Sequence, residues 1–473
     1  MAETLGGRLV KNGLVTAEQV DKALFRQKLH GGRLGQNLIT LGFISPDELD
    51  SFLRYRPPAP TTVQETGLSL DFISELALKT VSHLGNFSIS DVSDRLLLPV
   101  EVLKPVVQNL RQEKLCEVRG GTGYDSETYS FSVSAAGRQR TTELLARDQY
   151  AGPAPVPLEE YERLFEYQTV RNAFVRMEEI HNAFSPFVLS ETLMGQLGPA
   201  INSGRSIFLY GPPGNGKTTI AETLGTLMGD NIYIPHAIMV DREIIRVFDP
   251  ISHKTPPPAP PEMADGQAAA DRRWVLCRRP VVLVGGELTL DMLELDVRPA
   301  GGFYEAPLQL KANGGIFIID DFGRQMVRPQ DLLNRWTVPL ERRSDFLTLS
   351  SGKKFDIPFD QLVVFSTNIE PKELVDEAFL RRIRYKIRIG HPTKDEYREI
   401  FRRVCDGNGI EYRPDVVEYL LSEHYEKKGV MLNACHPRDL IDHITDIARF
   451  RNMEPALERQ IVDEAWHNFF IDV

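Results

Sequence analysis

Short apolar runs recur through the last two thirds of the chain, and longer segments with helical spacing separate them. The runs are four or five residues long and lie at 206–210, 232–235, 281–284, 316–319 and 362–366. Runs of this length that are apolar on both faces are typical of strands buried in a parallel sheet. From about residue 393 the pattern is helical. The pattern therefore predicts a doubly wound α/β core at 149–392 and an α-helical lid at 393–473.

The first fifty-five residues contain an internal repeat with a constant offset of 29 residues. The first copy holds Leu5-Gly6, Leu9, Gly13-Leu14-Val15, Val20 and Leu24, and the second holds Leu34-Gly35, Leu38, Gly42-Phe43-Ile44, Leu49 and Leu53. In each copy a glycine, Gly13 or Gly42, should end a short helix, and Thr16 or Ser45 should cap the next one. Neither unit can bury its apolar face alone, so we expect the two to pack into a small all-α domain at 1–55.

A third pattern lies between two proline-rich stretches. Helices are expected at about 69–84, 88–96 and 100–114, then strands at 115–119 and 128–133, and a closing helix at 135–147. This is the element order of a winged helix, an α+β domain predicted at 67–148. The proline-rich stretches at 56–66 and 152–157 are typical of semi-rigid spacers at domain boundaries.

Charge and composition narrow the possible partners. The formal net charge is −11, which argues against nucleic-acid binding through bulk charge. Residues 67–148 hold 9 Lys and Arg against 11 Asp and Glu, so the winged-helix region is also acidic. No signal peptide and no apolar run of about 18 residues is present. We therefore expect no transmembrane segment and a cytoplasmic protein, peripheral to the inner membrane only through a partner.

A glycine-rich loop carries the clearest chemistry. It follows the apolar run at 206–210, precedes a helical segment and reads Gly211-Pro212-Pro213-Gly214-Asn215-Gly216-Lys217-Thr218-Thr219. Its spacing is that of a phosphate-binding loop, in which backbone amides and a helix N-terminus surround the phosphates of ATP. Lys217 should reach the β- and γ-phosphates, and the Thr218 hydroxyl should bind Mg²⁺.

An acidic pair, Asp320-Asp321, follows the apolar run at 316–319. Asp320 should hold Mg²⁺ directly or through water, and Asp321 should polarise the attacking water. About a hundred residues separate this pair from the phosphate loop. The two motifs together predict ATP hydrolysis.

With these motifs the chain resembles the AAA+ ATPases over about two thirds of its length, and within them the helix-2-insert or MoxR-like group. The resemblance makes Asn368 the sensor-1 residue, Arg381 or Arg382 the arginine finger, and Arg438 the sensor-2 residue. Arg384 is a weaker finger candidate. An arginine finger acts on the ATP of a neighbouring subunit, so the resemblance implies a ring-shaped assembly, expected to be a hexamer. In most relatives a Glu stands where this chain has Asp321, so hydrolysis could be slow here.

Two aromatic residues in the long insertion before Asp320, Phe303 and Tyr304, leave two readings open. They either grip a substrate in the pore of the ring or pack within the insertion. The segment 351–361, before the sensor-1 strand, is expected to form a β-hairpin, as in the same group of relatives.

The repeat region resembles the N-terminal domain of type II secretion and type IV pilus assembly ATPases. That resemblance implies a cyclic di-GMP site, of which this chain keeps Gln27 in one unit and Arg33 in the other. Thr4 and Tyr55 stand where the family has Arg and Gln. The alternative is a helical protein-docking domain.

The sequence thus predicts an AAA+ ATPase that remodels or regulates an unidentified partner protein assembly. The resemblance of the repeat region implies that this assembly is secretion or pilus machinery and that cyclic di-GMP tunes the ATPase. The alternative is an ATP-switched transcription regulator that binds DNA through the winged helix. A scaffold with little turnover is a third reading, which Asp321 leaves open.

Overall fold

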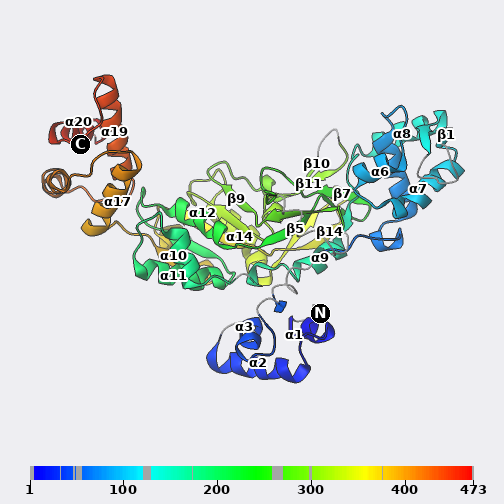
Figure 1. Ribbon diagram of the computed structural model, residues 1–473, viewed down its shortest axis with the longest axis horizontal. Coiled ribbons are helices and arrows are strands. Elements are labelled where there is room, and N and C mark those ends of the chain that lie inside the picture. The colour runs from blue at the N-terminus through cyan, green and yellow to red at the C-terminus, as the bar shows by residue number, and fades with distance from the viewer. Residues whose placement is uncertain are drawn as a thin grey trace.

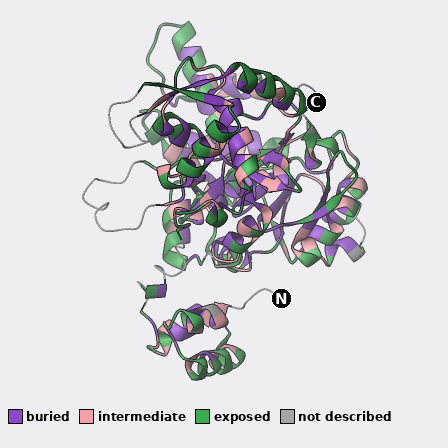
Figure 2. Ribbon diagram, turned by 90° about the vertical axis from the view of Figure 1, so that its right-hand side faces the viewer, coloured by how far each residue is buried: buried purple, intermediate pink, exposed green. Residues whose placement is uncertain are grey.

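A computed structural model describes residues 5–31, 34–45, 48–49, 56–120, 129–172, 174–257, 270–297, 301–374 and 377–470. The α/β core occupies the middle of an elongated molecule, with the lid at one end and the region 67–148 at the other (Figure 1). The first helices lie apart from these layers in both views (Figures 1 and 2).

The central sheet has five parallel strands in the order β16-β4-β15-β12-β9. Their bounds are β4 (Ile207–Tyr210), β9 (Val281–Val284), β12 (Ile316–Ile319), β15 (Leu362–Thr367) and β16 (Tyr385–Arg388). Four of the five predicted runs supply β4, β9, β12 and β15, and this part of the prediction is confirmed. The predicted α/β core is therefore present as a parallel sheet.

The expectation for the run at 232–235 was wrong. It lies in β5 (Asn231–Pro235), which pairs antiparallel with β8 (Trp274–Arg278) in a separate two-stranded sheet. The fifth parallel strand is instead β16, which the apolar pattern missed because Lys386 and Arg388 are exposed on it. An apolar run reports burial, whereas the choice of partner strand depends on residues far away in the chain.

Helices and loops cover both faces of the central sheet. On one face Ile207, Leu209 and Ile318 pack with residues of the helix that follows the phosphate loop. On the other face Phe208, Phe317 and Phe365 pack around the fully buried Trp336. The helices beside the sheet are α10 (Met177–Phe184), α11 (Glu191–Asn202), α12 (Lys217–Leu227) and α14 (Pro329–Arg342). Successive side chains of each strand point to opposite faces of the sheet and so pack into two separate hydrophobic cores.

A second, mixed sheet has the order β10-β11-β7-β6-β3. Its strands are β3 (Val156–Pro157), β6 (Ala237–Val240), β7 (Glu243–Arg246), β10 (Asp296–Val297) and β11 (Tyr304–Glu305). The Phe303 ring packs edge-on against Tyr150 with centroids 5.5 Å apart. Tyr304 is 1% exposed and its hydroxyl donates to Ser350 Oγ. Of the two readings for these aromatics, the structure favours packing.

A hairpin precedes β15, as expected, but the bounds of the prediction were wrong. Strands β13 (Ser344–Thr348) and β14 (Lys354–Pro358) pair antiparallel, and only β14 lies in the predicted segment 351–361. The remaining short helices are α9 (Leu158–Phe165), α13 (Leu308–Lys311), α15 (Pro371–Leu374) and α16 (Glu377–Leu380).

The region 67–148 has the predicted element order of three helices, a hairpin and a helix. Its elements are α5 (Leu70–Val81), α6 (Ile89–Leu96), α7 (Val100–Gln112), β1 (Cys116–Gly120), β2 (Ser130–Val133) and α8 (Ala135–Arg147). Its hydrophobic cluster continues into Ala237 and Ile244 of the second sheet. The Lys79 ammonium, 4% exposed, lies 2.7 Å from the Asp148 carboxylate. This region is packed onto the core.

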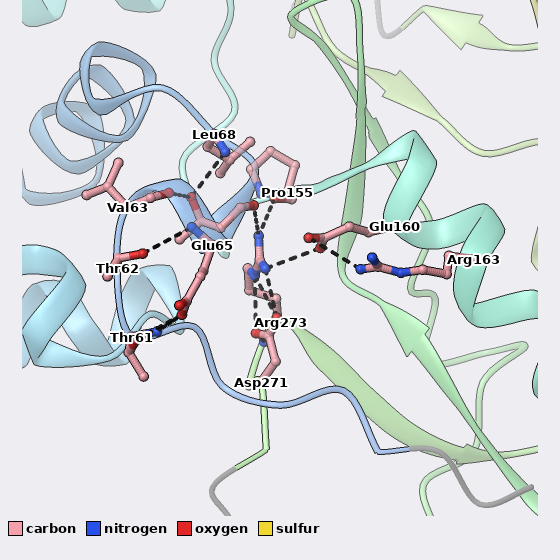
Figure 3. A network of polar contacts seen from close by, with 11 residues as sticks. Thr61, Thr62, Val63, Glu65, Leu68, Pro155, Glu160, Arg163, Asp271 and Arg273 are labelled. Atoms are coloured by element: carbon pink, nitrogen blue, oxygen red, sulfur yellow. Dashed lines mark hydrogen bonds and ion pairs between the residues drawn. The ribbon is translucent and has the colours of Figure 1, made fainter. Parts of the chain in front are cut away.

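The two proline-rich stretches are not spacers, and that interpretation is corrected. Val156 and Pro157 form strand β3 of the second sheet. Along the stretch 56–66, Pro57 O accepts a hydrogen bond from the Asp271 amide at 2.9 Å. Arg273, 1% exposed, donates to Thr66 O and Pro155 O and pairs with Asp271 (Figure 3). A buried guanidinium therefore holds both stretches against the core.

The first helices are α1 (Leu5–Lys11), α2 (Ala17–His30) and α3 (Leu34–Thr40). Gly13 and Gly42 both adopt φ 70°, and Thr16 caps α2 in a capping box with Gln19, as the repeat predicted. Gln27 lies in α2. Thr4, Arg33 and Tyr55 lie outside the described residues.

The lid is helical, as predicted. It consists of α17 (Lys394–Gly407), α18 (Pro414–Tyr419), a π-helical turn (Leu420–Glu426), α19 (His436–Phe450) and α20 (Arg459–Phe469). In the described part of the chain, no helix combines the length and apolar composition that a membrane crossing requires.

Candidate nucleotide-binding site

The predicted site residues gather at one edge of the central sheet. The phosphate loop follows β4, Asp320 and Asp321 follow β12, and Asn368 follows β15. These strands are parallel, so their carboxyl ends meet at the same edge, where open α/β sheets bind their ligands. Because β15 lies between β4 and β12, Asn368 is placed between the loop and the acidic pair.

Two glycines of the loop are required by close approach as well as by backbone angle. Gly211 has φ 138°, and a Cβ there would lie 2.1 Å from Ile389 O. Gly214 has φ 75°, and a Cβ there would lie 2.6 Å from the Cys435 sulfur. The loop is therefore pressed against the chain that leads into the lid and against the lid itself.

Lys217 begins helix α12 and is 6% exposed. Its ammonium donates to Gly211 O at 3.0 Å and to Pro212 O at 2.8 Å. Burial lowers the pKa of Lys217, and the charges of Asp320 and Asp321 oppose that shift. A buried cation held by carbonyls of its own loop is suited to a polyanion that brings stronger acceptors.

The Thr218 hydroxyl donates to Asp320 Oδ2 at 2.8 Å. A hydroxyl and a carboxylate are oxygen ligands of the kind Mg²⁺ prefers. Within the described residues no three or more His, Cys, Asp or Glu side chains gather to hold a metal ion. Mg²⁺ needs no such group, because in nucleotide sites it takes one or two protein oxygens together with phosphates and waters. The residues present fit Mg²⁺ bound with ATP.

Asp321 has the unusual φ of 47° for a residue that is not glycine. The Asn368 amide donates to Asp321 Oδ1 at 3.1 Å. The Gln325 amide donates to the carbonyls of Asp320 and Asp321 at 2.8 and 3.2 Å. Sequence reasoning missed Gln325, although its position just after the acidic pair was a local signal that could have found it.

The candidate arginines differ in their surroundings. The Arg382 guanidinium donates to Glu341 Oε1 of α14 in the same chain at 2.5 Å. Arg381 and Arg384 are exposed. In the described part of the chain Arg381 forms no ion pair. Arg438 lies in the first turn of α19, is 70% exposed, and has Asp439 at 3.5 Å. Arg381 is thus the better placed of the two finger candidates for a neighbouring molecule.

The structure also joins the loop to the lid, which the sequence did not predict. The Cys435 amide donates to Gly214 O at 2.9 Å, and the Asn215 side chain bonds Asn433 and Ala434. About 220 residues separate these partners in sequence, so no local pattern signals the contact.

Comparisons with known proteins add little beyond the coarse fold. A family model described as a domain of unknown function, DUF8689, matches residues 393–468, within the lid. No curated protein matches this chain. Among solved structures, the chain is similar to RuvB of Thermotoga maritima, a Holliday junction branch migration motor. The identity is 15% and the TM-score 0.34, over 64% of this chain and 74% of that one.

A second similar structure is NtrX of Brucella abortus, solved in complex with ADP. The identity is 14% and the TM-score 0.36, over 60% of this chain and 56% of that one. Both likenesses concern the coarse fold, so nucleotide binding is inferred here from the site residues themselves.

Proposed function

We propose that this chain is an ATP hydrolase of the AAA+ class. The observation that best supports this is the hydrogen bond of 2.8 Å between Thr218 and Asp320, residues 102 positions apart. It joins the end of the phosphate loop to the acidic end of β12. A hydroxyl and a carboxylate at that distance form the protein half of a Mg²⁺–nucleotide site.

Each residue then has a distinct task. Lys217 would offset the charge of the β- and γ-phosphates. Thr218 and Asp320 would hold Mg²⁺, which neutralises the charge that develops on the transferred phosphoryl group. Asp321 would take the proton of the attacking water. Asn368 would hold the Asp321 carboxylate in place, as its hydrogen bond to Oδ1 suggests.

Two variants test this assignment. Lys217→Ala should abolish ATP binding, because the buried phosphate charge would lose its cation. Asp321→Asn should keep binding but lower turnover about 10²- to 10⁴-fold, since an amide cannot take up a proton. The measurements are binding of a fluorescent nucleotide and release of phosphate.

Asp331→Asn is the matched control, because Asp331 lies in the first turn of α14 and pairs at the surface with Arg328, the residue before the helix. It should leave both binding and turnover unchanged. Full turnover in the Asp321 variant would remove Asp321 from the role of base.

We propose further that the active form is a ring, as a hexamer, in which Arg381 reaches the nucleotide of the next subunit. Subunits with Lys217→Ala and subunits with Arg381→Ala should each be inactive alone. Mixed rings should recover part of the activity, because some interfaces then combine an intact loop with an intact finger. Mixtures that co-assemble without any recovery would contradict a finger acting between subunits.

The finer proposal is that this ATPase remodels or regulates a partner protein assembly and that the repeat region tunes it by binding cyclic di-GMP. Gln27 and Arg33 would supply the single retained set of guanine contacts. Calorimetry on the full chain with cyclic di-GMP, compared with Arg33→Ala, tests the second part. No heat at high micromolar ligand would leave the repeat region as a protein-docking domain.

A further inference from the structure

One hydrogen-bonded cluster joins the phosphate loop to the lid where α19 begins. The Asn215 amide group donates to Asn433 Oδ1 at 3.2 Å. The backbone amide of Ala434 donates to Asn215 Oδ1 at 3.0 Å. Asn215 is 6% exposed, and its partners Asn433 and Ala434 are half-buried. The loop and the lid are therefore linked by both ends of one buried side chain.

The orientation of both amides follows from the chemistry of their partners. A backbone N–H can only donate, so Ala434 fixes Asn215 Oδ1 as the acceptor and turns Asn215 Nδ2 toward Asn433 Oδ1. The Asn433 amide nitrogen then faces His436 Nε2 at 3.2 Å. Burial lowers the pKa of His436 to about 4, so the ring is neutral near pH 7. Its Nε2 accepts from Asn433, and its Nδ1 carries the proton.

The chain of hydrogen bonds continues into the core of the lid. His436 Nδ1 lies 3.0 Å from Tyr425 Oη and donates to it. The Tyr425 hydroxyl in turn lies 2.7 Å from Tyr397 Oη. Tyr425 and Tyr397 are 2% and 0% exposed. Donors and acceptors are thus matched from the phosphate loop to two buried tyrosines, with no conflict along the way.

The segment between core and lid meets the same asparagine. His391 follows β16, and its Nδ1 lies 2.9 Å from Asn433 Oδ1 and 2.8 Å from Leu432 O. Both of these partners accept, so His391 Nδ1 donates. Asn433 therefore receives hydrogen bonds from the phosphate loop and from the connection between core and lid at once.

The loop end of this cluster touches the carbonyl that Lys217 uses. Pro212 O accepts from Lys217 Nζ at 2.8 Å and from Asn215 Nδ2 at 3.4 Å. An anion that draws the Lys217 ammonium away leaves this carbonyl with fewer donors. Asn215, which divides its amide protons between the loop and Asn433, then shifts the balance toward the loop.

We propose that Asn215 is a positioning residue that couples the state of the phosphate loop to the lid through Asn433. The proposal rests on the proposed ATPase function. The link fixes the start of α19, and therefore Arg438 in its first turn, relative to the phosphates. Breaking the link on the lid side, at Asn433, leaves the phosphate loop unchanged but frees the lid from responding to the nucleotide.

Hydrogen exchange of the segment 432–436 in the full chain measures the link directly, because Ala434 and Cys435 donate their amides to the loop. Asn215→Ala and Asn433→Ala should each speed exchange there about two- to tenfold, the cost of one hydrogen bond. The double variant should add little to either. Asn215→Asp keeps an acceptor for Ala434 and should restore part of the protection. Asn408→Ala, which removes an exposed lid side chain that donates to Val404 O of α17, is the control.

Nucleotide then provides a readout that a merely structural role would not move. ADP and a slowly hydrolysed ATP analogue should give different exchange at 432–436 in the wild type, and Asn433→Ala, which alters the lid side of the link, should lose that difference while still binding a fluorescent ADP. No difference in the wild type, a difference retained in Asn433→Ala, or unchanged exchange of the variants without nucleotide would overturn the coupling. Failure of the wild type to bind ADP would reject the proposed function, and the variant effects measured without nucleotide would still decide whether the link exists.

Discussion

The two regions that precede the core look alike in sequence but join it differently. Each is a small, mostly helical unit followed by a proline-rich stretch. The region 67–148 shares its hydrophobic cluster with the second sheet. Among the described residues, the buried hydrophobic cluster of the repeat region consists of Leu9, Val15, Val20, Ala23, Leu38, Ile44 and Leu49, all from the region itself. The region also leaves Phe25 and Leu29 exposed by 65% and 64%.

This difference shows that the composition of a proline-rich stretch does not determine whether the region before it packs onto the core. Both stretches are rich in proline, and both are held by Arg273 through Thr66 O and Pro155 O. What separates the two regions is whether apolar side chains of the core join their hydrophobic clusters. Ala237 and Ile244 of the second sheet join the cluster of 67–148.

The largest loss of stability is expected on removal of the Arg273 guanidinium, which holds the two proline-rich stretches. Arg273→Ala would leave Asp271 as a buried, unpaired charge and two carbonyls without donors. We expect a loss of about 3–5 kcal/mol in the free energy of unfolding, measured with denaturant. Arg272→Ala is the neighbouring control, because its ion pair with Asp94 is 52% and 69% exposed and should matter little. Equal effects of the two variants would show that the linkers are not held by burial.

A core substitution in each region tests whether the two regions unfold together with the α/β core. Leu9→Ala should remove about 2–5 kcal/mol from the repeat region alone, because that side chain packs in a cluster whose described members all lie in this region. Leu103→Ala should have a similar size but should act on the core as well, since its cluster is shared. Hydrogen exchange resolved along the chain separates the two cases. Loss of protection in the central sheet on Leu9→Ala would contradict an independent repeat region.

The smallest expected effect is a dependence of stability on pH that arises from two histidines of the α/β core. Burial lowers the pKa of His236 and His253 from 6.5 to about 4. The unfolded chain therefore binds more protons than the folded one between pH 6.5 and 4, so stability falls as the pH falls through this window. From pH 7 to pH 5 we expect about 1–2 kcal/mol less stability for each histidine. His253→Asn should flatten part of this dependence, and an unchanged pH profile would contradict it.

Much of the candidate site could be predicted from the sequence because its signals are local. The loop from Gly211 to Thr219 and the pair Asp320-Asp321 are contiguous, and each follows a readable strand. Parallel strands bring their carboxyl ends to one edge, so these motifs had to meet. The repeat also predicted the left-handed glycines and the Thr16 cap, because a helix end depends on a few neighbouring residues.

Only the tertiary structure decided which segments became partners. The sequence alone determined that a glycine-rich loop, an acidic strand end and a helical C-terminal region exist. It did not determine that β5 pairs with β8, that Arg273 holds both linkers, or that Asn215 meets Asn433. Those contacts join residues far apart in the chain, and each depends on the shape and charge of a surface that many other residues build. A local sequence pattern indicates which side chains of a segment are buried. Which segment packs against them depends on the tertiary structure.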